Sequence, residues 1–240
     1  MSPDVRELAF PGDLAAGSSG PGVRRVQEWL CHHGYALRCD GAWGPATTAA
    51  LGALQHAREL PVGPVLTVET WDALVAPLRR AAAPVVLPGG TLGAAALAVA
   101  RLYLRERPRE IGGSNKGPWV RHLTGGAEVA WCAGFVRTVL RQAAASLGLH
   151  APAWTSLSVA TMADLAAPHG LEVDHRDVKP GDVFFWVHQG HGHTGLVAEL
   201  QGGGSLGTIE GNTDPGGSRE GDGVYGRRRA VAGLRFLRVG

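Results

Sequence analysis

The spacing of apolar residues changes along this chain and divides it into two parts. Between residues 12 and 78 apolar side chains recur at three- and four-residue intervals, as at Val23 and Val26, which predicts helices. Beyond Gly181 they form short runs bounded by glycine, which predicts strands. Segment 79–90 is rich in alanine, proline and glycine and has no apolar period, so we expect a linker. We therefore expect two domains, at residues 12–78 and 91–240.

Three short helices are predicted in the first part. Residues 20–22 (GPG) start the first helix and Gly34 stops it, and a turn at 40–45 precedes the second. Thr67 can cap a third helix that runs to Leu78. An all-α unit of this size buries only a small core, which suits a binding module better than an enzyme.

Helices come first and strands afterwards in the second part. A helix is expected from Thr91 to about Arg105, and a longer one from about Trp131 to Leu147. Four strands are expected after them, at 183–187, 194–200, 206–210 and 234–239. This order predicts an α+β domain in which helices pack on an antiparallel sheet.

Composition excludes several classes of function. The chain has 23 basic and 21 acidic residues and a net charge of +2, without the concentrated basic face that a nucleic-acid binder needs. The first thirty residues show no basic leader followed by an apolar run, so we expect no secretory signal. The apolar stretch 92–100 is too short to span a bilayer. We expect a monomer that is made in the cytoplasm and does not insert into membranes.

The three cysteines are too few for a disulfide scaffold. Cys31 and Cys39 could pair or remain two free thiols. Cys132 stands alone in the second part, at the predicted N-terminus of the long helix. Backbone N–H groups at such a position favour a thiolate, which is the nucleophilic form of cysteine. A buried structural cysteine is the alternative for Cys132 considered by itself.

Other polar residues could complete a nucleophilic site. His193 opens a predicted strand, and Glu210 and Asn212, two residues apart, share one face of an extended segment. A hairpin of strands 194–200 and 206–210 would lay that face beside His193. A cysteine nucleophile needs a base, and the base needs a group that orients it. Cys132, His193 and either Glu210 or Asn212 could supply these parts.

Four motifs in the second part occur in the order of a known family. They are WCAGFV at 131–136, KPGDV at 179–183, GHTGLV at 192–197 and IEGN at 209–212. The chain from about residue 93 to 240 resembles the CHAP family, the cysteine, histidine-dependent amidohydrolases/peptidases. The resemblance implies a papain-like fold that hydrolyses amide bonds of peptidoglycan. It also implies that Cys132 is the nucleophile, His193 the general base and acid, Glu210 the residue that orients His193, and Asn212 a supporting fourth member.

The first part is similar to the three-helix peptidoglycan-binding domain. The similarity rests on GPGVRRVQ at 20–27, DGAWGPAT at 40–47 and TWDAL at 70–74. Bacterial peptidoglycan is therefore the expected partner, and Trp43 and Asp40 are candidate contacts with it. Asp40 could equally make a turn, and Trp43 could be core.

The second part also differs from some members of the CHAP family around the candidate site. Residues 107–131 contain no aspartate, so we expect no calcium site there. His188 and His191 lie in a glycine-flanked loop and lack the helical spacing that zinc hydrolases use, so we expect neither a metal nor another cofactor. Papain-like enzymes often place an oxyanion-binding glutamine before the cysteine, where this chain has Trp131. Trp131 and Asn115 are candidates for lining the substrate cleft, with a plain turn as the alternative for Asn115.

These features predict a peptidoglycan hydrolase of the endolysin or autolysin type. It would cleave the N-acetylmuramoyl-L-alanine bond as an amidase, or a peptide bond as an endopeptidase. It would act on the wall or in the periplasm as a phage-type lysin or a secreted effector. A catalytically inactive wall-binding protein and an acyltransferase with the same nucleophile are the alternatives.

Overall fold

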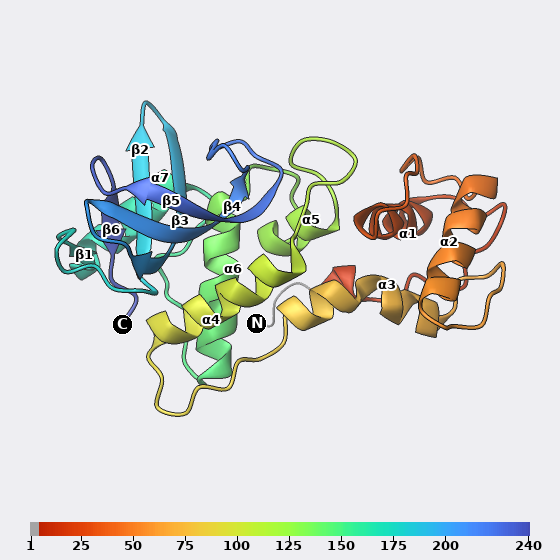
Figure 1. Ribbon diagram of the computed structural model, residues 1–240, viewed down its shortest axis with the longest axis horizontal. Coiled ribbons are helices and arrows are strands. Elements are labelled where there is room, and N and C mark those ends of the chain that lie inside the picture. Colours follow the sequence, from red (N-terminus) through yellow and green to blue (C-terminus); the bar gives the residue numbers. More distant parts are fainter. Residues whose placement is uncertain (1–4) are drawn as a thin grey trace.

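A helical module occupies one end of the molecule and an α+β domain the other (Figure 1). The computed structural model describes residues 5–240. Residues 1–4, the start of the segment searched for a secretory leader, lie outside this range. Within residues 5–240 no helix combines the length and apolarity needed to cross a membrane.

The N-terminal module contains the three helices that the sequence predicts. Proline in the first turn of α1 and α2 suits positions whose N–H has no partner within the helix. The Thr67 hydroxyl accepts a hydrogen bond from the Thr70 N–H and caps α3. Apolar faces of the helices meet around the buried Trp29, Leu51 and Trp71. The elements are η1 (Val5–Glu7), α1 (Pro21–His32), α2 (Pro45–Ala57) and α3 (Val68–Ala81).

The connection between the two parts begins later than predicted. Helix α3 continues to Ala81, three residues into the segment 79–90 that the sequence marks as a linker. The following residues are held against the second domain, because Gln142 donates hydrogen bonds to the carbonyls of Ala81 and Ala83. Alanine and arginine are good helix formers, so the composition of this stretch did not mark the true helix end.

Helices pack on a six-stranded antiparallel sheet in the second domain, which confirms the predicted α+β class. The strand order is β1-β6-β2-β3-β4-β5. Helices α4 and α6 cross beside one face of the sheet (Figure 1). The helices are α4 (Leu92–Glu106), α5 (Pro118–Thr124), α6 (Cys132–Ser146), α7 (Val159–Ala166) and η2 (Ala167–His169). The strands are β1 (Glu172–Val173), β2 (Val183–His188), β3 (His191–Leu200), β4 (Ser205–Thr213), β5 (Gly223–Ala230) and β6 (Arg235–Leu237).

All four predicted strands exist, with different ends. Strand β3 begins three residues early, at His191, and β4 continues three residues late, to Thr213. The last strand, predicted at 234–239, is shortened to β6. The sequence did not predict β5, which contains three consecutive arginines and little apolar alternation.

Small residues let α6 approach its neighbours closely. A Cβ on Gly211 of β4 would lie 2.6 Å from the Cβ of Phe135 on α6. A Cβ on Gly134 of α6 would lie 2.8 Å from the Leu123 carbonyl oxygen at the end of α5. These approaches fix the beginning of α6 between α5 and the sheet.

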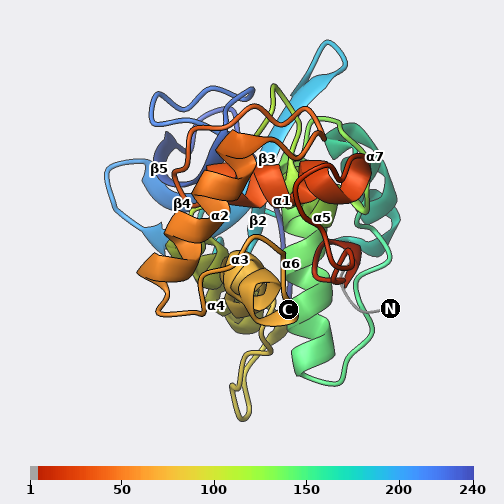
Figure 2. The same ribbon diagram turned by 90° about the vertical axis from the view of Figure 1, so that its right-hand side faces the viewer.

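Helix α5 of the second domain lies against α1 of the module (Figure 2). Arg121 of α5 pairs with Glu28 of α1 at 2.6 Å and with Glu7 of η1 at 2.7 Å. The Trp119 indole N–H donates to Nδ1 of His32 at 3.3 Å. Glu28 is fully buried, and Arg121 and Arg24 are the cations that pair with its carboxylate.

Removing Arg121 should therefore destabilise the protein. Arg121→Met keeps most of the side-chain volume but takes one cation from two buried carboxylates, although Arg24 and Arg25 remain nearby. We expect a loss of about 2 kcal/mol in the free energy of unfolding, measured by urea denaturation. Arg79→Ala is the control, since the Arg79–Asp72 pair is about half exposed and should contribute little. Equal effects of the two substitutions would contradict the importance of this contact.

Candidate active site

Cys132 is the first residue of α6. Trp131 occupies the N-cap position, and its carbonyl accepts a hydrogen bond from the Phe135 N–H at 2.8 Å. The Cys132 thiol is free and its side chain is 6% exposed. The structure thus confirms the predicted place of this cysteine at a helix N-terminus, where backbone N–H groups point toward a bound or developing anion.

His193 lies on β3, whose neighbour β4 carries Glu210. The two strands pair directly, as the predicted hairpin requires. Nε2 of His193 donates to Oε2 of Glu210 at 2.8 Å, and both side chains are fully buried. Among residues 5–240, Nδ1 of the ring has no hydrogen-bond partner of good geometry. Nδ1 is therefore the ring nitrogen that is available to interact with the Cys132 thiol.

The charge state of His193 follows from its neighbours. Burial by itself lowers the pKa of this imidazole, but interactions with Cys132 and then Glu210 outweigh it and raise the pKa to about 9. The ring is consequently protonated at neutral pH, between a sulfur on one side and a carboxylate on the other.

Glu210 is held by more partners than the sequence suggests. Arg229 donates to both carboxylate oxygens, at 2.8 Å from Nε to Oε1 and 2.5 Å from Nη2 to Oε2. The Thr208 hydroxyl donates to Oε1 at 2.5 Å. Burial raises the pKa of Glu210, yet Arg229, His193 and Thr208 together lower it to about 2. The carboxylate is therefore ionised and has a fixed orientation.

The sequence did not identify Arg229 or Thr208 as site residues. Arg229 belongs to strand β5, which the sequence did not predict. Its three consecutive arginines form a pattern that is typical of a solvent-exposed segment. The spacing of Thr208 and Glu210, two residues apart on β4, was the one available signal for the threonine.

Asn212 is buried near the end of β4 and has a different contact from the one expected. Its backbone is left-handed, with φ 55°. Its side-chain amide donates to the Arg219 carbonyl at 3.5 Å, and no hydrogen bond joins it to His193 within the described chain. The geometry ties Asn212 to the loop before β5, while its supporting role beside His193 stays a prediction.

Trp131 lies in the interior of the second domain. It is fully buried, packs close to Gly211, and its indole N–H donates to Oε1 of Glu110 at 2.9 Å. The side chain anchors the residue before Cys132, while its assignment to the lining of the substrate cleft stays a prediction. Asn115 has a left-handed backbone with φ 55° and donates to the Ser114 hydroxyl, as a turn residue would. Its contact with substrate stays a prediction.

The two candidate wall contacts in the module have structural partners. Trp43 is 4% exposed, and its indole N–H donates to the Thr48 hydroxyl at 3.0 Å. Asp40 accepts hydrogen bonds from the Ala42 N–H and the Gln27 amide. Trp43 thus belongs to the core and Asp40 to the turn, and contact of either residue with peptidoglycan stays a prediction.

His188 and His191 lie on the β2–β3 hairpin, and Cys31 and Cys39 lie in the N-terminal module. His188 and His191 face each other at the exposed end of the β2–β3 hairpin. Across residues 5–240, no three histidine, cysteine or acidic side chains gather to hold a metal ion. Cys31 and Cys39 are free thiols with 3.6 Å between their sulfurs.

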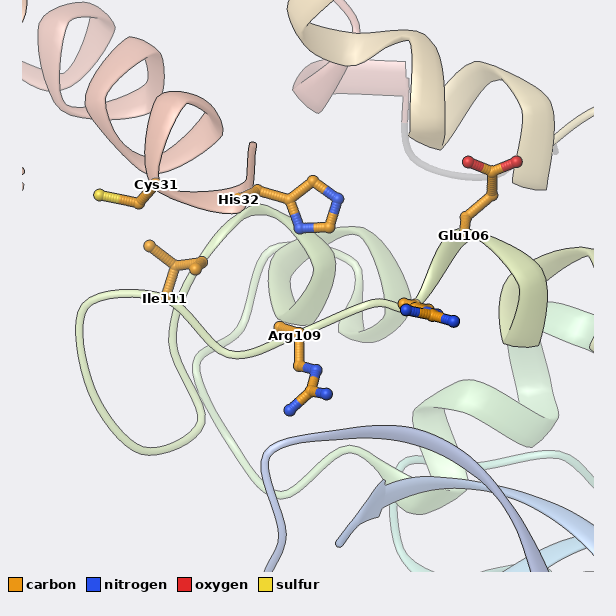
Figure 3. Close-up of a pocket in the computed structure, with 6 residues that line it drawn as sticks. Cys31, His32, Glu106, Arg109 and Ile111 are labelled. Carbon is orange, nitrogen blue, oxygen red and sulfur yellow. The ribbon is translucent and has the colours of Figure 1, made fainter. Parts of the chain in front are cut away.

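A separate cavity of about 320 Å³ opens where the module meets the second domain (Figure 3). Cys31 and His32 enter it from the end of α1, and Glu106 comes from the end of α4. The cavity contains none of the side chains around Cys132, so it is distinct from the candidate active site.

Comparisons with known proteins agree with this division. Residues 124–212, which include Cys132, His193, Glu210 and Asn212, match the model of the CHAP domain. Residues 19–74 match the family described as "Putative peptidoglycan binding domain". The crystal structure of the SleB N-terminal domain is 33% identical over 28% of this chain and 96% of that one, with a TM-score of 0.28. No curated protein matches the chain. The chain thus joins an N-terminal peptidoglycan-binding domain to a CHAP domain.

Proposed function

We propose that this protein hydrolyses an amide bond in the stem peptide or cross-bridge of bacterial peptidoglycan, with Cys132 as the nucleophile. The CHAP domain implies amidase or peptidase activity on peptidoglycan. The observation that carries the finer proposal is the buried imidazole of His193, which bonds Glu210 through Nε2 and interacts with Cys132.

The reaction begins from a thiolate on Cys132 and an imidazolium on His193. The sulfur attacks the carbonyl carbon of the scissile amide, and the C–N bond breaks as His193 protonates the leaving amine. Water then attacks the acyl-thioester and gives a proton to His193, and Cys132 leaves as the thiolate. Glu210 keeps the proton on Nε2 throughout, so that Nδ1 exchanges the proton.

Backbone groups at the start of α6 support the charged intermediate. The N–H of Cys132 belongs to the first helical turn and has no partner within the helix. Such a donor can stabilise the oxyanion formed by attack at the adjacent sulfur. Trp131, anchored by Glu110, holds the backbone at this point.

The module at residues 19–74 retains the enzyme on the wall, where we infer that it acts as a monomer. Its contact with α5, which ends eight residues before Cys132, keeps the module and the catalytic domain in one orientation. Release as a phage-type lysin and delivery as a secreted effector are both compatible with this function.

Replacing the nucleophile should separate catalysis from binding. Cys132→Ala should abolish lysis of purified cell walls, measured by turbidity, because no other group can form the thioester. Co-sedimentation with the same walls should be unchanged. Cys31→Ser and Cys39→Ser are matched controls that should lyse normally, since both thiols lie in the module. Lysis by Cys132→Ala would exclude the mechanism.

The pKa of His193 predicts the pH dependence of catalysis. Because the imidazolium is the acid, kcat/KM should fall as the pH rises through about 9. Since Glu210 is one of the two groups that raise this pKa, Glu210→Gln should move the alkaline limb to lower pH. Glu199→Gln, on the exposed end of β3, should leave the limb in place. A limb that stays near 9 in Glu210→Gln would remove Glu210 from its proposed role.

The same pKa has a consequence for stability. The pKa of His193 in the folded protein lies above its ordinary value of 6.5. Protonation therefore stabilises the fold fully below pH 6.5, and this contribution disappears as the pH rises through about 9. Urea unfolding of wild type and His193→Gln across this range should show the loss in wild type alone.

A further inference from the structure

Arg229 contacts the candidate site from a strand that the catalytic motifs do not include. It lies on β5 opposite Leu206 of β4, and its side chain extends along β4 to Glu210. The guanidinium meets the carboxylate with two hydrogen bonds, one to each oxygen. This fork geometry orients a carboxylate, which a single donor does not.

Glu210 depends on these donors because it is fully buried. Oε1 accepts from Arg229 and Thr208, and Oε2 accepts from Arg229 and His193. A buried carboxylate that loses a charged partner carries an uncompensated charge. Two cations, His193 and Arg229, face the ionised Glu210, and removing Arg229 takes one of them away.

We propose that Arg229 is a positioning residue for hydrolysis, which fixes the Glu210 carboxylate so that His193 presents Nδ1 to Cys132. This inference rests on the proposed function and adds a member to the same site. Without the guanidinium, the carboxylate can rotate or take a proton, and the imidazolium loses its support.

The charged groups around this cluster come from several elements. Cys132 on α6 and Glu210 on β4 act on His193 of β3, while Arg229 on β5 and Thr208 on β4 act on Glu210. Arg229 is the first of the groups that lower the pKa of Glu210, and Asp214 in turn acts on Arg229. Loss of Arg229 should therefore raise the pKa of Glu210.

Arg229 also touches the loop before β5, which suggests a purely structural alternative. Its Nη1 donates to the Gly217 carbonyl at 3.1 Å. Arg227, two residues earlier on the same strand, donates to the Pro215 carbonyl of the same loop and makes no hydrogen bond to Glu210. Arg227→Gln therefore removes an anchor of the loop while leaving the Glu210 contact intact, which makes it the matched control.

The test measures the alkylation rate of Cys132 by iodoacetamide against pH in the full-length protein. Trypsin releases residues 122–137, which contain Cys132 and neither other cysteine, so mass spectrometry can follow this thiol by itself. Wild type should react at a plateau rate up to about pH 9, as a thiolate–imidazolium pair does. The same variants are assayed for kcat and KM on purified walls.

In Arg229→Gln the alkaline end of the plateau should move to lower pH, as in Glu210→Gln, because His193 loses the support of an oriented carboxylate, and kcat should fall by at least about tenfold, as for one pKa unit. Arg229→Lys restores the charge but not the two-point hydrogen bonding, so it should recover much of the alkaline range of the plateau with a kcat below wild type. Arg227→Gln should match wild type in both measurements.

Two outcomes would overturn the inference. One is a wild-type pH profile and kcat in Arg229→Gln, and the other is an equal loss in Arg227→Gln, which would assign the effect to the loop. If Arg229→Gln does not fold, wild-type kcat in Arg229→Lys would exclude the positioning role. Failure of the proposed function is distinguishable, since wild type would then show no plateau.

Discussion

The hydrogen bond between His193 and Glu210 is the contact on which the proposed function depends. It joins two fully buried ionisable side chains from adjacent strands, and burial alone would favour the neutral form of each. Partners on both sides reverse that preference, with Cys132 beyond the imidazole and Arg229 beyond the carboxylate. The fold therefore brings α6, β3, β4 and β5 together around one row of charges.

Close packing makes this row possible. Gly211 lets α6 approach β4, and Gly134 lets α5 approach α6, so the first turn of α6 is held against the sheet. Trp131 is fixed at the same point by Glu110, from the segment after α4. On the other side, Arg121 ties α5 to the module. The helix that carries Cys132 thus contacts both the sheet and, through α5, the peptidoglycan-binding domain.

The sequence predicted those parts of the site whose local pattern matches their structure. Cys132 precedes a helical apolar period, and the β3–β4 hairpin has strands of apolar and β-branched residues bounded by glycine. The pattern failed where long-range contacts override it. Strand β5 has a run of three arginines that donate hydrogen bonds to Glu210, to the Ser205 hydroxyl and to loop carbonyls, so its sequence does not resemble that of a strand. Trp131 and Asn212 belong to family motifs. Their hydrogen-bond partners, Glu110 and the Arg219 carbonyl, are too distant in sequence for residue spacing to predict them.

The most direct test of this account is the protonation state of His193, observed by NMR in protein labelled with ¹⁵N-histidine. Comparison with His193→Gln assigns its signals among those of the ten histidines. The account predicts an imidazolium at neutral pH that loses its proton near pH 9, and a lower pKa in Cys132→Ala. A ring that is already neutral at pH 7, or one that does not respond to loss of the Cys132 thiol, would contradict it.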